Sequence, residues 1–185
     1  MKVNTICFLI MVFFFSCNQG IDSSTYLKIR ESGNEISGKV QATLLSNVGT
    51  AIQYGGAEHA VEFCNLKAGA IVDSLNHEFD CKITRITNKT RNAENGLSSS
   101  QEMEFWKIFE ANTLADTVVK EANALVFYKP IRIGMPACLK CHGNTESDID
   151  TATRQKLRKL YPNDLATGYR LNDLRGLWKI EFEKK

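Results

Sequence analysis

The segment Cys138-Leu139-Lys140-Cys141-His142 constrains this chain more than any other stretch of its sequence. Two cysteines that are separated by two residues and followed by a histidine form the attachment pattern of c-type haem. The thiols add to the two vinyl groups of the porphyrin, and the adjoining imidazole binds the iron. We therefore predict one covalent haem c, with Cys138 and Cys141 as its thioether links and His142 as proximal axial ligand.

Two other interpretations of this segment stay open. A zinc site would need further ligands from elsewhere in the chain to complete a tetrahedral shell. A thioredoxin-like redox pair would need a strand-to-helix context near a βαβ unit.

The length and the net charge of the chain limit the classes of protein to which it can belong. The chain has 185 residues, which is enough for one domain with a sizeable core. Its net charge of +2 comes without a clustered basic region of the kind that binds DNA or RNA. We therefore expect no nucleic-acid partner.

The N-terminus predicts export. Lys2 is followed by an apolar run from Ile6 to Phe15 and then by Ser16-Cys17, which resembles a bacterial lipoprotein leader. This divides the chain into a signal peptide (1–16), a lipidated tether with an N-terminal helix (17–47) and a main domain (48–185). We expect Cys17 to be acylated and to anchor the protein in a membrane, facing the periplasm or the cell exterior. An ordinary secretory peptide and an uncleaved anchor helix are the alternatives, and both also export the domain.

Cys7 leaves with the leader, and Cys17 and the two motif cysteines already have predicted roles, so two of the six cysteines remain. Cys64 lies in a predicted helix, about 57–75, between Ala60 and Ala68, and such small neighbours would let a flat macrocycle approach the helix. The alternative is a small buried thiol. Cys81 lies on the apolar side of a predicted strand, about 79–87, where we expect it to fill the core. A disulfide with Cys64 is the less favoured option.

In the rest of the chain, apolar residues recur with the spacing of helices in some segments and of strands in others. Gly55-Gly56 breaks or bends the chain, and Ser99 with Glu102 forms a capping box for a helix with an apolar stripe. That stripe, which we assign to the core, is Met103, Trp106, Phe109 and Leu114. Further helices are predicted at 44–52 and 151–160, and strands at 125–128, at 131–133 and from 177 to 182.

The other charged candidates are weaker. His59 points away from Cys64 on a regular helix, and His77 lies in a polar connection, so we expect neither to bind the iron. The helix at 151–160 carries a basic surface that could steer an acidic redox partner, although such a run is often only a solvated face. Its basic residues are Arg154, Lys156, Arg158 and Lys159.

Several fragments now stand in a recognisable order. They are Gly55-Gly56, Ala60-Val61-Glu62-Phe63-Cys64, Arg91-Asn92-Ala93-Glu94-Asn95, Tyr128-Lys129-Pro130-Ile131, the haem motif with Gly143, and Tyr161-Pro162 through Arg175-Gly176. Together they resemble a PAS-like haem-c domain family, first catalogued as a domain of unknown function. Its members occur as stand-alone exported proteins and as the sensing regions of bacterial signalling proteins. The resemblance covers about residues 48–182.

The resemblance implies an α+β fold, in which a PAS-like antiparallel sheet carries N-terminal and flanking helices and one covalently bound haem. It also implies histidine and cysteine as axial ligands, which in this sequence are His142 and Cys64. The sequence departs from the family pattern at Ala93, where proline is usual, and at Asn172, where glycine is common. Asparagine tolerates the left-handed conformation better than most residues, so we expect the turn at Asn172 to survive.

Two strong axial ligands would leave no open position on the iron, which argues against an enzyme that activates oxygen or peroxide. We expect a membrane-tethered electron carrier or redox-binding protein. The alternative is a sensor of redox state or of a diatomic gas, in which Cys64 leaves the iron and a separate partner receives the signal. A peroxidase-like enzyme would require Cys64 to be absent from the iron. The haem propionates have four candidate partners, which the sequence does not rank: Arg85, Arg91, Arg132 and Arg175.

Overall fold

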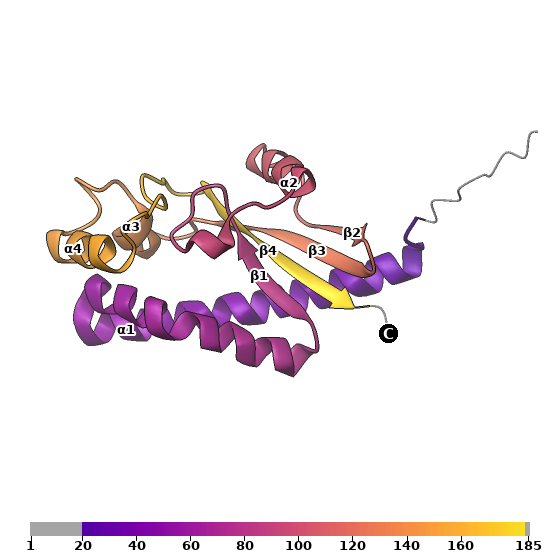
Figure 1. Cartoon of the computed structure of the whole chain (residues 1–185), viewed down its shortest axis with the longest axis horizontal. Helices are drawn as coiled ribbons and strands as arrows, with labels where there is room; N and C mark the ends of the chain where they lie inside the picture. The colour runs from indigo at the N-terminus through magenta and orange to yellow at the C-terminus, as the bar shows by residue number, and fades with distance from the viewer. Residues whose placement is uncertain (1–19, 184–185) are drawn as a thin grey trace, which may run out of the picture.

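The computed structural model describes residues 20–183 and begins with a long helical hairpin, α1 (Ser23–Phe79). Asp22 caps its start, where the side chain accepts a hydrogen bond from the amide of Thr25. The helix turns back on itself at Gly55 and Gly56, which have non-helical dihedral angles, so its two arms run antiparallel (Figure 1). Gly56 has a φ of 76°, a conformation that glycine adopts without strain. The bend predicted at this glycine pair is therefore confirmed.

The second part of the fold is a four-stranded antiparallel sheet in the order β1-β4-β3-β2. Its strands are β1 (Lys82–Ile86), β2 (Thr117–Glu121), β3 (Ala124–Arg132) and β4 (Leu174–Glu183). The long central pair, β3 and β4, keeps one register until a bulge between Ile131 and Arg132. This bulge lies at the end of the sheet that leads into the haem motif.

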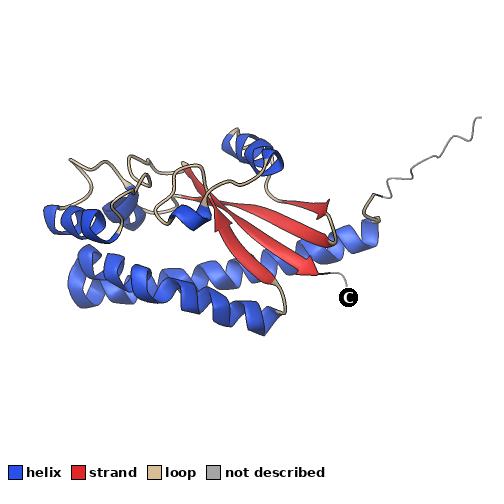
Figure 2. Ribbon diagram, in the orientation of Figure 1, coloured by secondary structure: helices blue, strands red, loops and turns tan. Residues whose placement is uncertain are grey.

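Helices cover both faces of the sheet (Figure 2). The hairpin α1 packs on one face through an apolar cluster that includes Val40, Phe127 and Ile180, all fully buried. On the other face lies α2 (Ser100–Glu110), which contributes Trp106 and Phe109 to a second cluster. The sheet is therefore the middle layer of the molecule.

Three short helices complete the chain, and two of them carry the residues of interest. η1 (Ala93–Asn95) follows β1, while α3 (Pro136–His142) and α4 (Thr151–Leu160) lie between β3 and β4. Figure 1 shows α3 and α4 beyond the end of the sheet, next to the turn of the α1 hairpin. The chain thus brings the haem motif close to the second arm of α1.

The predicted α+β class with an antiparallel sheet is confirmed. The helix at 151–160 has the predicted bounds, and the Ser99 hydroxyl accepts a hydrogen bond from the Glu102 amide at the start of α2. The assignment of the apolar stripe to the core is right for Trp106 and Phe109. It is wrong for Met103, which is 50% exposed, and for Leu114, which lies beyond the end of α2.

Two strand predictions are corrected. Residues 125–133 do not form two strands on either side of Pro130, because β3 runs through the proline. The neighbouring strand β2 begins at Thr117, opposite Tyr128, so β3 is an edge strand on that side at Pro130, where a missing amide is tolerated. The pattern analysis also missed β2, a short strand, and it began the strand of Cys81 at Phe79, which instead ends α1.

The signal peptide, Cys7 and the predicted lipidation site Cys17 lie outside the described residues, and the predicted domain boundaries stay predictions. Within residues 20–183, none of the helices combines the length and the apolar character that crossing a membrane requires.

Candidate functional site

The haem motif lies on α3, a helix of two turns with well-defined ends. Pro136 occupies its first turn, where the missing amide costs no hydrogen bond. Gly143 ends it and donates its amide to the carbonyl of Leu139 at 2.8 Å. A Cβ atom at Gly143 would lie 2.6 Å from a carboxylate oxygen of Asp148 and 2.7 Å from the Leu139 carbonyl, so glycine is required here.

The two motif cysteines lie on one side of this helix. Cys138 and Cys141 are three residues apart, a spacing that places side chains on the same face. Cys138 packs against a small cluster that contains Tyr169, and Cys141 packs against another that contains Val61 of α1. Both cysteines are half-buried and unpaired. Their arrangement leaves both thiols free for bonds to one planar group.

His142 has a defined orientation. Its Nδ1 atom lies 2.8 Å from the carbonyl oxygen of Ala166 and 3.4 Å from Nε of Arg175. The carbonyl can only accept and the arginine can only donate, so we assign the proton to Nδ1 on the basis of the shorter contact. The assignment leaves Nε2 with a lone pair. No other described residue forms a hydrogen bond with Nε2, which is thus available to a metal.

The electrostatic surroundings keep His142 neutral. Burial is the main cause that holds the pKa of its imidazole well below the ordinary value of 6.5, and the charges of Arg91 and Arg175 act in the same direction. A neutral imidazole is the form that binds iron. The ring also meets that of Tyr169 edge-on, with 6.2 Å between the centroids.

The loop behind His142 is held by Arg91 and Asp164. The guanidinium of Arg91 donates to the Asp164 carboxylate at 3.0 Å, to the Cys141 carbonyl at 2.6 Å and to the Ala166 carbonyl at 3.2 Å. Backbone bonds from Gly168 to Gly143 and from Tyr169 to His142 complete the attachment. These contacts place the Ala166 carbonyl opposite Nδ1.

Cys64 lies on the second arm of α1 and is half-buried. Burial raises the pKa of its thiol, whereas Arg85 and Arg91 lower it. A charge on Cys64 would in turn raise the pKa of the Cys141 thiol, which reaches about 11 mainly through burial. The fold therefore brings Cys64 into the neighbourhood of the haem motif, as the ligand prediction requires.

The other cysteine, Cys81, belongs to a different part of the molecule. It packs against the cluster between α1 and the sheet, which confirms its assignment to the core. About 22 Å of helix separates Cys64 from Phe79, just before Cys81. A disulfide needs Cα atoms within about 7 Å. The disulfide option is therefore wrong, and both thiols are free.

The predicted ligands share one kind of surroundings. Cys64, Cys141 and His142 are each partly accessible, yet burial dominates the pKa shift of each. The surrounding protein therefore desolvates these side chains without covering them completely. Within residues 20–183, no three His, Cys, Asp or Glu side chains lie close enough to hold a bare metal ion, so the zinc interpretation gains no support.

The thioredoxin-like alternative is not supported either. All pairs of strands in the sheet are antiparallel, so the motif does not belong to a βαβ unit. The raised pKa of the Cys141 thiol also opposes a reactive thiolate.

The four candidate arginines are now distinguishable. Arg91 is paired with Asp164, and Arg132 donates to three oxygens of Phe109, Asn112 and Asn172. Burial lowers the pKa of Arg175 to about 10, and its remaining contacts are long bonds to Thr87 and Lys89 and the face of Tyr169. Arg85 lies beside the ring of Trp178, at 5.9 Å.

The two histidines that we excluded remain outside the site. His59 stacks at a tilt against Tyr54 beside the turn of the hairpin, and His77 is exposed. The sequence analysis missed Asp164 and the Ala166 carbonyl. Both lie in a fragment that carried the family resemblance, but nothing in the sequence pairs them with Arg91 or His142.

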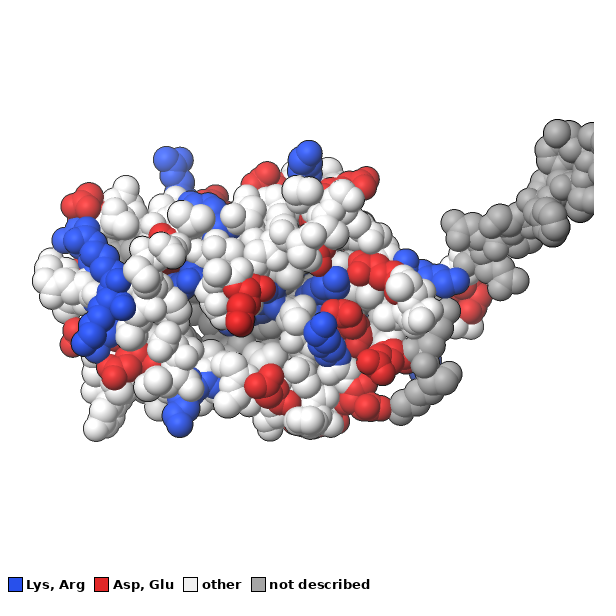
Figure 3. Space-filling view, in the orientation of Figure 1, with Lys and Arg blue, Asp and Glu red and all other residues white. Residues whose placement is uncertain are grey.

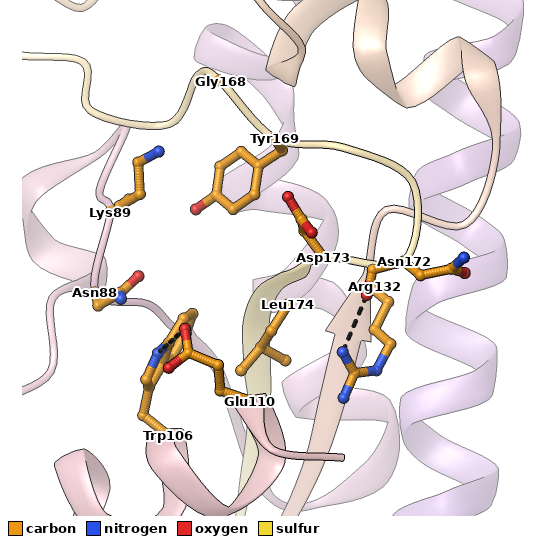
Figure 4. A pocket seen from close by; sticks show the side chains of 10 residues that line it. All are labelled: Asn88, Lys89, Trp106, Glu110, Arg132, Gly168, Tyr169, Asn172, Asp173 and Leu174. Carbon is orange, nitrogen blue, oxygen red and sulfur yellow. Dashed lines mark hydrogen bonds between the residues drawn. The ribbon is translucent and has the colours of Figure 1, made fainter.

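A separate pocket of about 350 Å³ lies between α2 and the loop before β4 (Figure 4). None of the four predicted haem-binding side chains lines it. Within it, Trp106 donates to Glu110 at 3.3 Å and Arg132 donates to the Asn172 carbonyl. Asn172 has a φ of 71°, so the expected left-handed turn is present. Tyr169 lies between this pocket and His142.

Comparisons with known proteins agree with this description. A family model described as Tll0287-like matches residues 21–182. The crystal structure of the cyanobacterial haem protein Tll0287 matches with a TM-score of 0.58 and 19% sequence identity, over 82% of this chain and 96% of that chain. None of the curated proteins matches.

Proposed function

The chain belongs to the Tll0287-like family, and on this premise we propose that it is a c-type haem protein that acts in electron transfer or redox binding. The observation that carries the proposal is the neutral His142, whose Nδ1 is bound to Ala166 and whose Nε2 is free beside two unpaired cysteines. The solved relative is itself named as a haem protein.

Each proposed residue has one task. Cys138 and Cys141 would hold the porphyrin covalently, and His142 and Cys64 would supply the two protein ligands of its iron. A haem supplies reversible one-electron chemistry between ferric and ferrous iron. Arg91 and Asp164 hold the Ala166 carbonyl in place, and that carbonyl fixes the orientation of the His142 ring.

The Cys64 thiol must lose its proton to act as a ligand. Burial opposes this loss, and the positive charges of Arg85 and Arg91 favour it. With both axial positions filled by protein, no position is left for oxygen or peroxide, so we propose that the protein is not an enzyme.

We also propose that the protein is exported and tethered to a membrane through a lipid on Cys17, and that it exchanges electrons with an acidic partner protein. Figure 3 shows lysine and arginine side chains gathered over α4. Arg154 is paired with Glu146 and Lys156 with Glu62, which leaves Arg158 and Lys159 exposed and available to such a partner.

The function is tested by the mass and spectra of the mature protein. We expect the mass of the processed chain plus one haem, a ferric low-spin spectrum and reversible one-electron reduction. Replacing Cys138 and Cys141 by serine should abolish the covalent gain in mass. A colourless product with the mass of the bare chain would refute the proposal.

The ligand Cys64 is tested by electron paramagnetic resonance of the oxidised protein. We expect a thiolate-type low-spin signal that disappears in Cys64→Ala. Cys81→Ala is the matched control, because it removes a half-buried thiol from the opposite end of α1. A signal that persists in Cys64→Ala would exclude Cys64 as the ligand.

A sensor is the second candidate, and one observation favours it. Cys64 lies on the second arm of α1, which the glycine pair separates from the first, so a change at Cys64 would act on this arm first. Release of Cys64 from the iron would then change the surface shown to a partner. Rapid binding of carbon monoxide to the reduced protein, with a change in helix packing, would support the sensor. A spectrum that does not change when the gas is added would support the electron carrier.

A further inference from the structure

Arg85 lies on the face of the sheet that α1 covers. Side chains alternate along β1, and Ile83, two residues earlier, belongs to the cluster between the sheet and α1. The charge of Arg85 interacts with Cys64 of α1 and with Tyr161 of the loop after α4. The guanidinium therefore points into the region between the sheet, α1 and the haem motif.

The surroundings of Arg85 combine access with enclosure. Its side chain is exposed in the isolated chain, yet burial lowers its pKa below the ordinary value of 12.5. The same combination holds for Cys64 and His142. Arg85 thus shares the desolvated surroundings of the predicted ligands and interacts by charge with one of them, Cys64.

Arg85 has no counter-charge among residues 20–183. No carboxylate of the described residues lies within ion-pair distance, and its guanidinium lies over the ring of Trp178, with 5.9 Å to the ring centroid. Other arginines have oxygen partners: Arg30 is paired with Asp116 and Arg91 with Asp164, and Arg132 has three oxygens. Surrounding protein desolvates the Arg85 guanidinium and supplies no counter-charge for it, so this position is suited to an anion from outside the chain.

We infer that Arg85 binds a propionate carboxylate of the haem. The inference rests on the proposed function, because it takes the porphyrin to be attached at Cys138 and Cys141. A carboxylate matches the planar fork of a guanidinium with two parallel hydrogen bonds, and no such group of the protein reaches Arg85. Arg91 and Arg132 already have oxygen partners, and Arg175 donates long hydrogen bonds to Thr87 and to the Lys89 carbonyl. Arg85 is therefore the candidate that has no hydrogen-bond acceptor among the described residues.

The competing partner is the thiolate of Cys64, the group that interacts most strongly with Arg85 by charge. The two possibilities differ in what a substitution disturbs. Loss of a propionate contact changes the vibrations of the propionate group and leaves the axial ligands alone. Loss of a thiolate contact changes the iron-sulfur bond instead.

The experiment compares three variants of the mature haem protein by resonance Raman spectroscopy, redox titration and electron paramagnetic resonance. Arg85→Gln should shift the propionate bending mode and lower the reduction potential, because an uncompensated carboxylate favours the ferric state. Arg85→Lys should restore most of the potential and shift the mode less, since charge is kept and the fork is lost. Lys28→Gln is the control: it removes an exposed charge from the first turns of α1, far from α3, and should change neither.

The inference is overturned if Arg85→Gln retains its haem and shows an unchanged propionate mode. It is also overturned if the variant changes only the paramagnetic signal of the thiolate. If Arg85→Gln does not mature, the decision passes to Arg85→Lys, whose unshifted propionate mode would have the same meaning. Failure of the proposed function is distinct from these results, because the wild-type protein would then carry no haem.

Discussion

The layer between α1 and the sheet and the end that carries α3 are held together by different means. In the first, a continuous apolar cluster encloses Val40, Phe127 and Ile180 completely. At the second, two clusters with only three fully buried members each are supplemented by the Arg91–Asp164 pair and by backbone hydrogen bonds to Gly143 and His142.

The difference follows from what each region has to do. Apolar packing has no preferred direction and closes any space that it borders. Hydrogen bonds and ion pairs have direction, so they can fix the orientation of His142 and of its loop. The apolar layer therefore supplies stability, and the polar end keeps the His142 ring in one orientation.

The largest effect is expected in the apolar layer. Phe127→Ala removes a fully buried ring and should lower the free energy of unfolding by about 3–5 kcal/mol, measured by denaturant titration. Leu27→Ala, at a position that is 60% exposed, is the control and should change little. The spectrum of the haem should be unaffected, since Phe127 lies in the layer and not at the α3 end. A loss below about 1 kcal/mol would contradict the role given to this layer.

A smaller loss of stability with a larger spectral change is expected at the α3 end. Asp164→Ala leaves the enclosed Arg91 without its carboxylate, which should cost about 2–3 kcal/mol because the carbonyls of Cys141 and Ala166 remain as partners. Since the Ala166 carbonyl is no longer held, the paramagnetic signal from His142 coordination should shift. Glu146→Ala breaks an exposed pair and should leave both stability and signal unchanged. An unshifted signal in Asp164→Ala would separate this pair from the orientation of His142.

The smallest effect is expected on the stability of the fold at acidic pH. Burial alone would raise the pKa of Glu102, but hydrogen bonds from Ser98 and Lys179 outweigh it and lower the pKa below the ordinary value of 4.5. The unfolded chain therefore binds a proton there before the folded chain does. The resulting stability is complete above about pH 4.5 and is lost as the pH falls through the lower, folded value.

Stability curves against pH for the wild type and Glu102→Gln test this dependence. The wild type should lose stability more steeply below about pH 4.5, because the variant lacks the carboxyl group that titrates. Near neutral pH, the stability of the two proteins should depend on pH in the same way. Equal slopes in acid would show that Glu102 does not contribute.

Local patterns predicted the elements whose signal is local. The capping box at Ser99, the bounds of α4 and the alternation in β4 all appear as expected. The pattern failed where a neighbour decides the outcome. β3 continues through Pro130 because its pairing with β2 reaches only to Tyr128, and β2 itself exists because β3 lies beside it.

The sequence by itself determined the attachment motif at 138–142 and most of the helices and strands, because such patterns depend only on residues that are close along the chain. The family and the α+β class followed from the resemblance that several short fragments carry. The tertiary structure decided the rest. It placed Cys64 near the motif, paired Arg91 with Asp164, turned Nδ1 of His142 towards Ala166 and left Arg85 without a counter-charge among the described residues. Such relations join residues that are far apart in the chain, and no local pattern encodes the distance between them.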